Sequence, residues 1–137
     1  RQEVKKCFEE NINKLRLEDY LGKNVEILYT DDIADYFKEF SQKLRKTDIL
    51  WSKPSEISFY TALGLPYIIA PTIGWQEKGN RDWLLRLNSG MDQLNPSYAH
   101  EWLFDLLDSG NLAKCAMHGF LEAEKMGTLN IRKILVQ

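Results

Sequence analysis

The sequence lacks the features that mark membrane-spanning, disulfide-rich and nucleic-acid-binding proteins. Its two cysteines, Cys7 and Cys115, lie far apart and form no CxxC motif, so neither a disulfide framework nor a zinc knuckle is indicated. No apolar run approaches the roughly 20 residues of a spanning helix. With 18 Lys and Arg against 20 Asp and Glu, the chain has no basic excess to bind phosphate backbones. We expect no transmembrane segment, no nucleic-acid partner and a reducing, cytoplasmic setting.

Motifs of self-contained active sites are missing as well. There is no GxGxxG or GxxxxGK[ST] loop and no GxSxG elbow. His100-Glu101 is followed by Phe104 where the zinc motif HExxH needs histidine. Asp31-Asp32 would need another Asp after a later strand to form a phosphate-accepting receiver site, but the later predicted strands end in Trp51 and Ala70. We therefore expect no metal ion and no tightly bound cofactor.

What the sequence does have is the composition of a folded domain. It has 137 residues, of which 44% are hydrophobic and 12% aromatic. This length is close to that of a typical domain and permits a sizeable core, so we expect residues 1–137 to form a single domain. Because the first residue is Arg1 and not Met, we also expect the segment to belong to a longer protein.

Short apolar strands alternate with amphipathic helices along the chain. This alternation predicts an α/β fold with a right-handed parallel sheet, flanking helices and a helical C-terminal cap. The tail Leu129–Val136 fits either helix or strand. Strands are expected at Val25–Tyr29, Asp48–Trp51, Tyr67–Ala70 and, more weakly, Gly90–Gln93. Helices are expected around Val4–Leu15, Ile33–Leu44, Ser55–Leu63, Gln76–Asn88, Asn95–Asp108 and Leu112–Ala123.

Polar and small residues follow each predicted strand, where open parallel sheets collect ligands. The segments are Tyr29–Asp32, Ser52–Glu56 and Pro71–Gln76. Lys53 adds a cation beside the start of the next predicted helix, which favours phosphate, and Glu56 is suited to accept hydrogen bonds from a ribose diol. An alternative is that Ser52 or Ser55 caps the helix and that Glu56 complements its positive end.

Six short motifs occur in a fixed order between Asn24 and Asn80. They are Leu28–Ile33, Thr47–Ser52, Ser55-Glu56, Ala62–Pro66, Ile68–Pro71, and Gln76 with Asn80. The ordered set resembles the nucleotide-sugar-binding C-terminal domain of GT-B-fold glycosyltransferases, in particular the UDP-N-acetylglucosamine transferase of peptidoglycan synthesis and related glycolipid synthases. The resemblance implies a partial Rossmann-like parallel sheet and a UDP-sugar as co-substrate. The donor-binding residues it implies are Ile33, Ser52, Lys53, Ser55, Glu56, Gln76 and Asn80.

The resemblance also implies a role for most of these residues. Glu56 would bind the ribose hydroxyls, Gln76 would face the donor sugar or its phosphates, and Asn80 would support the loop of Gln76. Ser55 and neighbouring amides would meet the pyrophosphate, and Ile33 would lie near the base. The chain departs from the family at Lys53-Pro54, where Gly and another small residue are usual, and at the bulky Trp75.

The same resemblance places part of the domain upstream of Arg1. The first strand, its Gly-rich loop and the acceptor-binding domain with the catalytic base would precede this chain, together with any membrane-peripheral contact. The sheet edges left open would then either close by pairing Val25–Tyr29 with Asp48–Trp51 or be covered in a homodimer.

These observations predict the donor-binding part of a glycosyltransferase that transfers a hexose, inactive alone, with an acceptor that the sequence does not identify. One alternative is part of a UDP-sugar 2-epimerase, although no histidine is evident near Gln76 for that chemistry. The other alternative is a non-catalytic binding or assembly domain, which Lys53-Pro54 makes credible.

Overall fold

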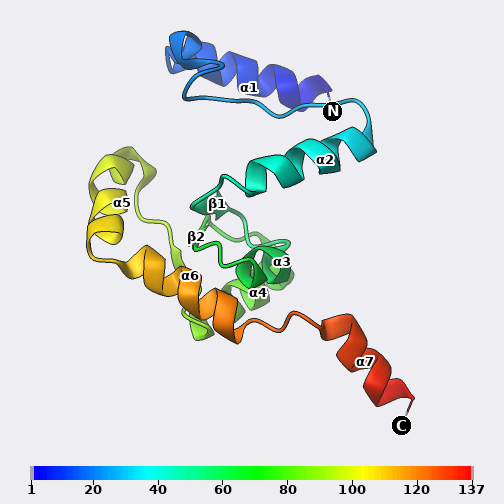
Figure 1. Ribbon diagram of the computed structural model, residues 1–137. Coiled ribbons are helices and arrows are strands. Elements are labelled where there is room, and N and C mark those ends of the chain that lie inside the picture. Colours follow the sequence, from blue (N-terminus) through cyan, green and yellow to red (C-terminus); the bar gives the residue numbers. More distant parts are fainter. Residues whose placement is uncertain (1, 137) are drawn as a thin grey trace. The chain divides into compact units, whose positions relative to one another are not determined.

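The computed structural model describes residues 2–136 and divides the chain into two compact units (Figure 1). The first unit is Arg1–Lys46 and the second is Thr47–Gln137. The expectation of a single domain stays a prediction. The two predicted helices of the first unit and most of the predicted elements of the second are present.

The first unit consists mainly of two amphipathic helices. Helix α1 spans Gln2–Lys14, a 3₁₀ turn (η1) spans Glu18–Tyr20, and α2 spans Ile33–Leu44. Helix α2 begins after Asp32, whose Oδ1 accepts hydrogen bonds from the backbone N–H of Ala34 at 2.8 Å and of Asp35 at 3.0 Å. This cap satisfies amide groups that would otherwise lack partners at the helix start.

The expected strand Val25–Tyr29 is wrong, because the segment belongs to no sheet. Its first residue closes a local turn, with the Val25 N–H donating to the carbonyl of Tyr20 at 3.0 Å and a single bridge joining Val25 to Leu21. Residues 26–29 and Val4 and Phe8 of α1 line a common cavity of about 200 Å³. The apolar side chains are thus partly covered by a helix and not by neighbouring strands.

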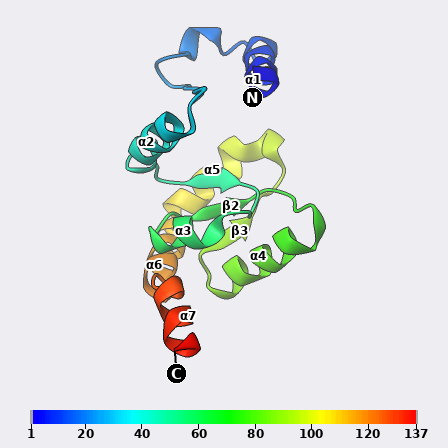
Figure 2. The same cartoon turned by 90° about the vertical axis from the view of Figure 1, so that its right-hand side faces the viewer.

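The second unit contains a three-stranded, fully parallel sheet, which confirms the α/β fold class. The strands are β1 (Leu50–Ser52), β2 (Tyr67–Ile69) and β3 (Gly90–Asp92), in the spatial order β1-β2-β3. Helix α3 (Ile57–Ala62) connects β1 to β2, and α4 (Gly74–Arg86) connects β2 to β3 (Figure 2). The expected pairing of Val25–Tyr29 with β1 is absent, since within residues 2–136 β1 pairs with β2 alone.

Three further helices follow the sheet. They are α5 (Ala99–Asp108), which the 3₁₀ turn η2 (Pro96–Tyr98) precedes, then α6 (Asn111–Glu122) and α7 (Gly127–Leu135). The tail that fitted either helix or strand is therefore helical. Gly110 takes a φ of 69° between α5 and α6, a backbone conformation that glycine adopts at little cost. No helix within residues 2–136 has the length and apolarity needed to cross a membrane.

The core of the second unit covers both faces of the central strand. Ile68 of β2 packs in a buried cluster with Trp102 of α5 and Leu112 of α6, while Tyr67 and Ile69, which alternate to the opposite face, are buried as well. The uninterrupted apolar run of β2 is thus covered on both faces, as is typical of strands in parallel sheets. Helix α6 also places Cys115 in the interior, whereas Cys7 of α1 is exposed.

Candidate functional site

The ends of the three strands lie side by side at one edge of the sheet. Ser52 is aligned with Ile69, and Ile69 is aligned with Asp92. The adjoining residues continue the pairing, because the N–H of Ala70 donates to the carbonyl of Ser52 at 2.9 Å and that of Gln93 to the carbonyl of Ile69 at 3.0 Å. The turn after β1 and the loop after β2, which carry most of the expected donor residues, therefore start next to each other.

The turn Ser52–Glu56 is anchored to the sheet by Tyr67. The Tyr67 hydroxyl donates to the carbonyl of Lys53 at 2.6 Å. The side chain of Ser52 forms a second hydrogen bond with the Tyr67 hydroxyl. Burial raises the pKa of Tyr67 above its ordinary value; the Ser52 hydrogen bond opposes this shift and the Glu56 carboxylate adds to it. With Pro54 buried and Lys53 and Ser55 exposed, the turn has a fixed inner side and an accessible outer side.

Asn80 connects the turn after β1 to the helix after β2. Its side-chain amide donates to the carbonyl of Pro54 at 2.8 Å and to that of Ser55 at 3.3 Å. These two bonds fix the backbone of the turn at Pro54 and Ser55. Asn80 therefore supports the turn after β1, whereas the resemblance implies support for the loop of Gln76.

Glu56 occupies the position before α3, and its side chain makes no hydrogen bond that caps the helix. Its Oε2 instead accepts a hydrogen bond from the Tyr60 hydroxyl at 3.3 Å. Because α3 begins at Ile57, neither Ser52 nor Ser55 is its cap residue, and the alternative explanation for these serines does not hold. A carboxylate offers about four lone-pair sites, so Glu56 keeps acceptor capacity for a further partner.

A groove of about 480 Å³ lies between the start of α3 and one face of α4. The side of α3 contributes Ser55, Ile57 and Ser58, and the side of α4 contributes Gln76, Gly79, Asn80, Trp83 and Arg86. Three expected donor residues, Ser55, Gln76 and Asn80, thus line the same groove. The residues from α4 recur at spacings of three and four, which places them on one helix face.

Trp83 and Arg86 were not expected at the site from the sequence, where the Trp83 region is most simply explained as core. Trp83 is half-buried and Arg86 is exposed, and both line the groove. The sequence contained an indication of both residues. Continuing from Gln76 and Asn80 at the spacing of one helical turn reaches Trp83 and then the neighbourhood of Arg86.

The remaining expected residues are not part of the groove lining. Ser52, Lys53 and Glu56 belong to the adjoining turn, whereas Ile33 is the exposed first residue of α2 in the other unit. Trp75 does not pack into the fold, since it is 86% exposed, with the Lys78 ammonium 5.1 Å from its ring centre.

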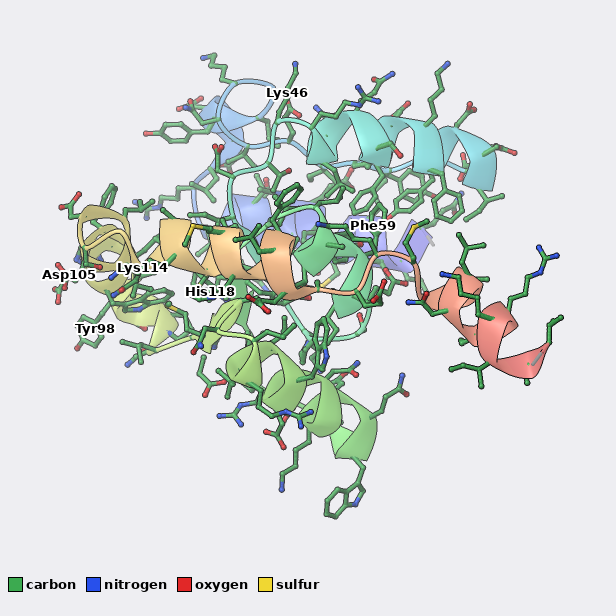
Figure 3. The ribbon with its side chains drawn as sticks, turned by 60° about the horizontal axis from the view of Figure 1, so that its bottom comes forward. Lys46, Phe59, Tyr98, Asp105, Lys114 and His118 are labelled. Carbon is green, nitrogen blue, oxygen red and sulfur yellow. The ribbon has the colours of Figure 1, made fainter. Side chains whose placement is uncertain are left out.

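A second depression, of about 760 Å³, adjoins the groove, and Ser58 and Trp83 line both. Its walls are mostly apolar and include Phe59 of α3, which Figure 3 labels, and Met126 before α7. His118, on α6 in the same figure, is half-buried and lines neither hollow. Nowhere in residues 2–136 do three or more His, Cys, Asp or Glu side chains gather so as to hold a metal ion.

Helix α4 is fixed to the sheet at the level of the groove by a salt bridge. The Arg81 Nε donates to Asp92 Oδ1 at 2.7 Å, and its Nη2 donates to the other carboxylate oxygen. Asp92 is the last residue of β3, so this paired contact holds the helix against the ends of the strands.

Comparisons of the chain with protein-family models, with curated proteins and with solved structures gave no match.

Proposed function

We propose that this chain is the nucleotide-sugar-binding part of a glycosyltransferase, that its donor is a UDP-sugar, and that its sheet is a partial Rossmann-like sheet with a helical C-terminal cap. The observation that carries the proposal is the groove that Ser55, Gln76 and Asn80 share beside the carboxyl ends of parallel strands. Ligands of open α/β sheets bind at this edge. The three residues come from two segments, and the ordered sequence motifs assign all three to donor binding.

In this proposal each part of the site has a distinct task. Glu56 accepts hydrogen bonds from the ribose hydroxyls, Gln76 contacts the donor sugar or its phosphates, and Lys53 supplies positive charge at the turn. Ile33 belongs to the first unit, and its contact with the base stays a prediction of the resemblance. The chain accelerates transfer by positioning the donor and stabilising the departing nucleoside diphosphate. None of the donor-binding residues is assigned the role of the base that activates the acceptor.

Titration of UDP and UDP-sugars into the full-length protein by calorimetry tests the proposal. Glu56→Gln removes the charge but keeps the shape of the side chain, and we expect it to weaken UDP binding about tenfold or more, because hydrogen bonds to a carboxylate are strong. Glu101→Gln is the matched control, since Glu101 is an exposed glutamate of α5 and lines no part of the groove. Equal UDP affinity in the wild type and Glu56→Gln would remove the basis for the assignment.

A second function, a non-catalytic binding or assembly domain, is favoured by one observation. Lys53-Pro54 replaces the usual small residues, and the Asn80 amide is engaged with the carbonyls of this turn. Absence of UDP binding by the correctly folded protein would support this function. Size-exclusion chromatography would then test whether the edge of β1 joins two copies in a homodimer.

A further inference from the structure

The groove between α3 and α4 has the composition of an anion site. Its polar lining consists of the hydroxyls of Ser55 and Ser58, the side-chain amides of Gln76 and Asn80, and the guanidinium of Arg86. None of the described residues that line it carries a carboxylate. The Asn80 amide already donates to the carbonyls of Pro54 and Ser55. The two hydroxyls and the Gln76 amide can still donate hydrogen bonds, and the single charge in the lining is positive, so the groove favours a ligand rich in acceptor oxygens.

Within residues 2–136, the side chain of Arg86 differs from that of Arg81, the other arginine of α4, in having no hydrogen-bond or ion-pair partner. Arg81 is paired with both Asp82 and Asp92, but no hydrogen bond or ion pair joins Arg86 to another residue in the described part of the chain. Its planar guanidinium has five N–H donors in an arrangement that matches phosphate oxygens. An unpaired arginine at the wall of a groove without acidic residues is therefore available to a bound phosphate.

The position of Arg86 on the helix directs it along the groove. It lies three residues after Trp83 and seven after Gly79, which is about two helical turns along the same face of α4. Helical side chains lean toward the N-terminus of their helix, which brings the guanidinium toward the turn that carries Trp83. The half-buried indole of Trp83 provides an apolar wall beside it, against which a ring of the ligand can pack.

We propose that this groove holds the diphosphate of the nucleotide-sugar and that Arg86 is a phosphate-binding residue of the site. The inference rests on the proposed function and deepens it, because the sequence motifs assign no role to Arg86. It changes where the diphosphate is held: along the face of α4, by a side-chain cation together with Ser58, and not by the backbone of the turn after β1 alone.

Affinities of the full-length protein for uridine, UMP and UDP, measured by calorimetry, test this inference. The wild type is expected to bind UDP more tightly than uridine. In Arg86→Gln, UDP affinity is expected to fall about tenfold or more while uridine affinity is unchanged, because only the phosphates lose a charged partner. Arg86→Lys keeps the charge but loses the paired donors, so its UDP affinity is expected to lie between those of the wild type and Arg86→Gln.

Lys78→Gln is the matched control. It removes one positive charge from the same helix, but Lys78 does not line the groove and lies over the Trp75 ring. Circular dichroism confirms folding of each variant. If Arg86→Gln keeps the full advantage of UDP over uridine, the inference is overturned while the proposed function stands. If the wild type binds neither ligand, the proposed function fails and this inference fails with it.

Discussion

Tyr67 links the central strand to the turn that carries most of the expected donor residues. Its ring is buried in the sheet, while its hydroxyl reaches the Lys53 carbonyl and the Ser52 side chain. One side chain therefore contributes to the core and also fixes the backbone of the turn. Residues with two such tasks are good sites for substitutions that separate stability from binding.

Replacement of Tyr67 by Phe is expected to reduce the free energy of unfolding by about 1 kcal/mol, because the hydrogen bonds of the hydroxyl are lost and the Lys53 carbonyl is left without this donor. Denaturant titration at pH 7 measures the change. Tyr98→Phe, at an exposed position, is the control and is expected to have almost no effect.

Tyr67 also predicts a dependence of stability on alkaline pH. Burial raises the folded pKa of Tyr67 above its ordinary value of 10.0, so the unfolded chain releases this proton first as the pH rises. The stabilisation is complete below pH 10 and is lost as the pH rises through the folded pKa. Between pH 9 and about 12, the wild type should lose more stability than Tyr67→Phe. Parallel curves for the two proteins would contradict this assignment.

Thr61 has a buried side-chain hydroxyl that lacks a hydrogen-bond partner in the described structure. The side chain is fully buried in α3. Thr61→Val keeps the shape and removes the hydroxyl, and we expect the free energy of unfolding to rise by about 1 kcal/mol. The measurement is again denaturant titration, with Thr128→Val, on the exposed surface, as the control. A destabilised Thr61→Val would show that the hydroxyl has a partner after all.

At the scale of elements, α3 and α6 approach each other closely because α6 has a glycine at the crossing. A Cβ atom on Gly119 would lie 3.0 Å from the Thr61 carbonyl oxygen and 3.3 Å from the Ser89 Cβ. The neighbouring atoms belong to backbone and short side chains, which have little room to move. The distance between the two helices is therefore set by the absence of one methyl group.

Gly119→Ala is expected to reduce the free energy of unfolding by about 1–3 kcal/mol through overpacking. Gly79→Ala provides the opposite control in α4, because nothing lies within 4 Å of its added Cβ. There alanine should stabilise the helix by up to about 1 kcal/mol. Thermal unfolding of both variants, followed by circular dichroism, should show midpoints that shift in opposite directions; a shift in the same direction would contradict this account.

The sequence predicts the elements of the second unit well for an identifiable reason. The run Tyr67–Ile69 is a local signal, and the structure fulfils it with a strand that is buried on both faces. Val25–Tyr29 failed because strand character in a sequence says nothing about an available partner strand. Trp83 and Arg86 were missed because the helical period that reaches them from Gln76 and Asn80 does not by itself show that α3 lies opposite.

At the scale of the whole molecule, the two units differ in how much core they contain. Ile12 is the one buried hydrophobic side chain among the described residues of the first unit, whereas the second unit contains the cluster around Ile68 and further buried side chains such as Leu84. Apolar burial is the main source of folding stability. The second unit therefore has what independent folding requires.

A fragment of residues 47–137 is accordingly expected to unfold in one cooperative transition, and a fragment of residues 1–46 to show none. Chemical denaturation followed by circular dichroism and by tryptophan fluorescence measures this, since coincident curves indicate a two-state transition. A 47–137 fragment that melts gradually would show that its core needs the preceding residues.

The two cysteines differ in exposure, so their rates of alkylation can report how often the interior of the second unit becomes accessible. Burial raises the pKa of the Cys115 thiol, so it stays protonated as well as shielded, and the thiolate is the form that reacts. Iodoacetamide should consequently modify Cys7 at once and Cys115 only when α6 detaches. The rate of the slow phase of alkylation, followed by mass spectrometry, therefore measures how often Cys115 becomes exposed under native conditions.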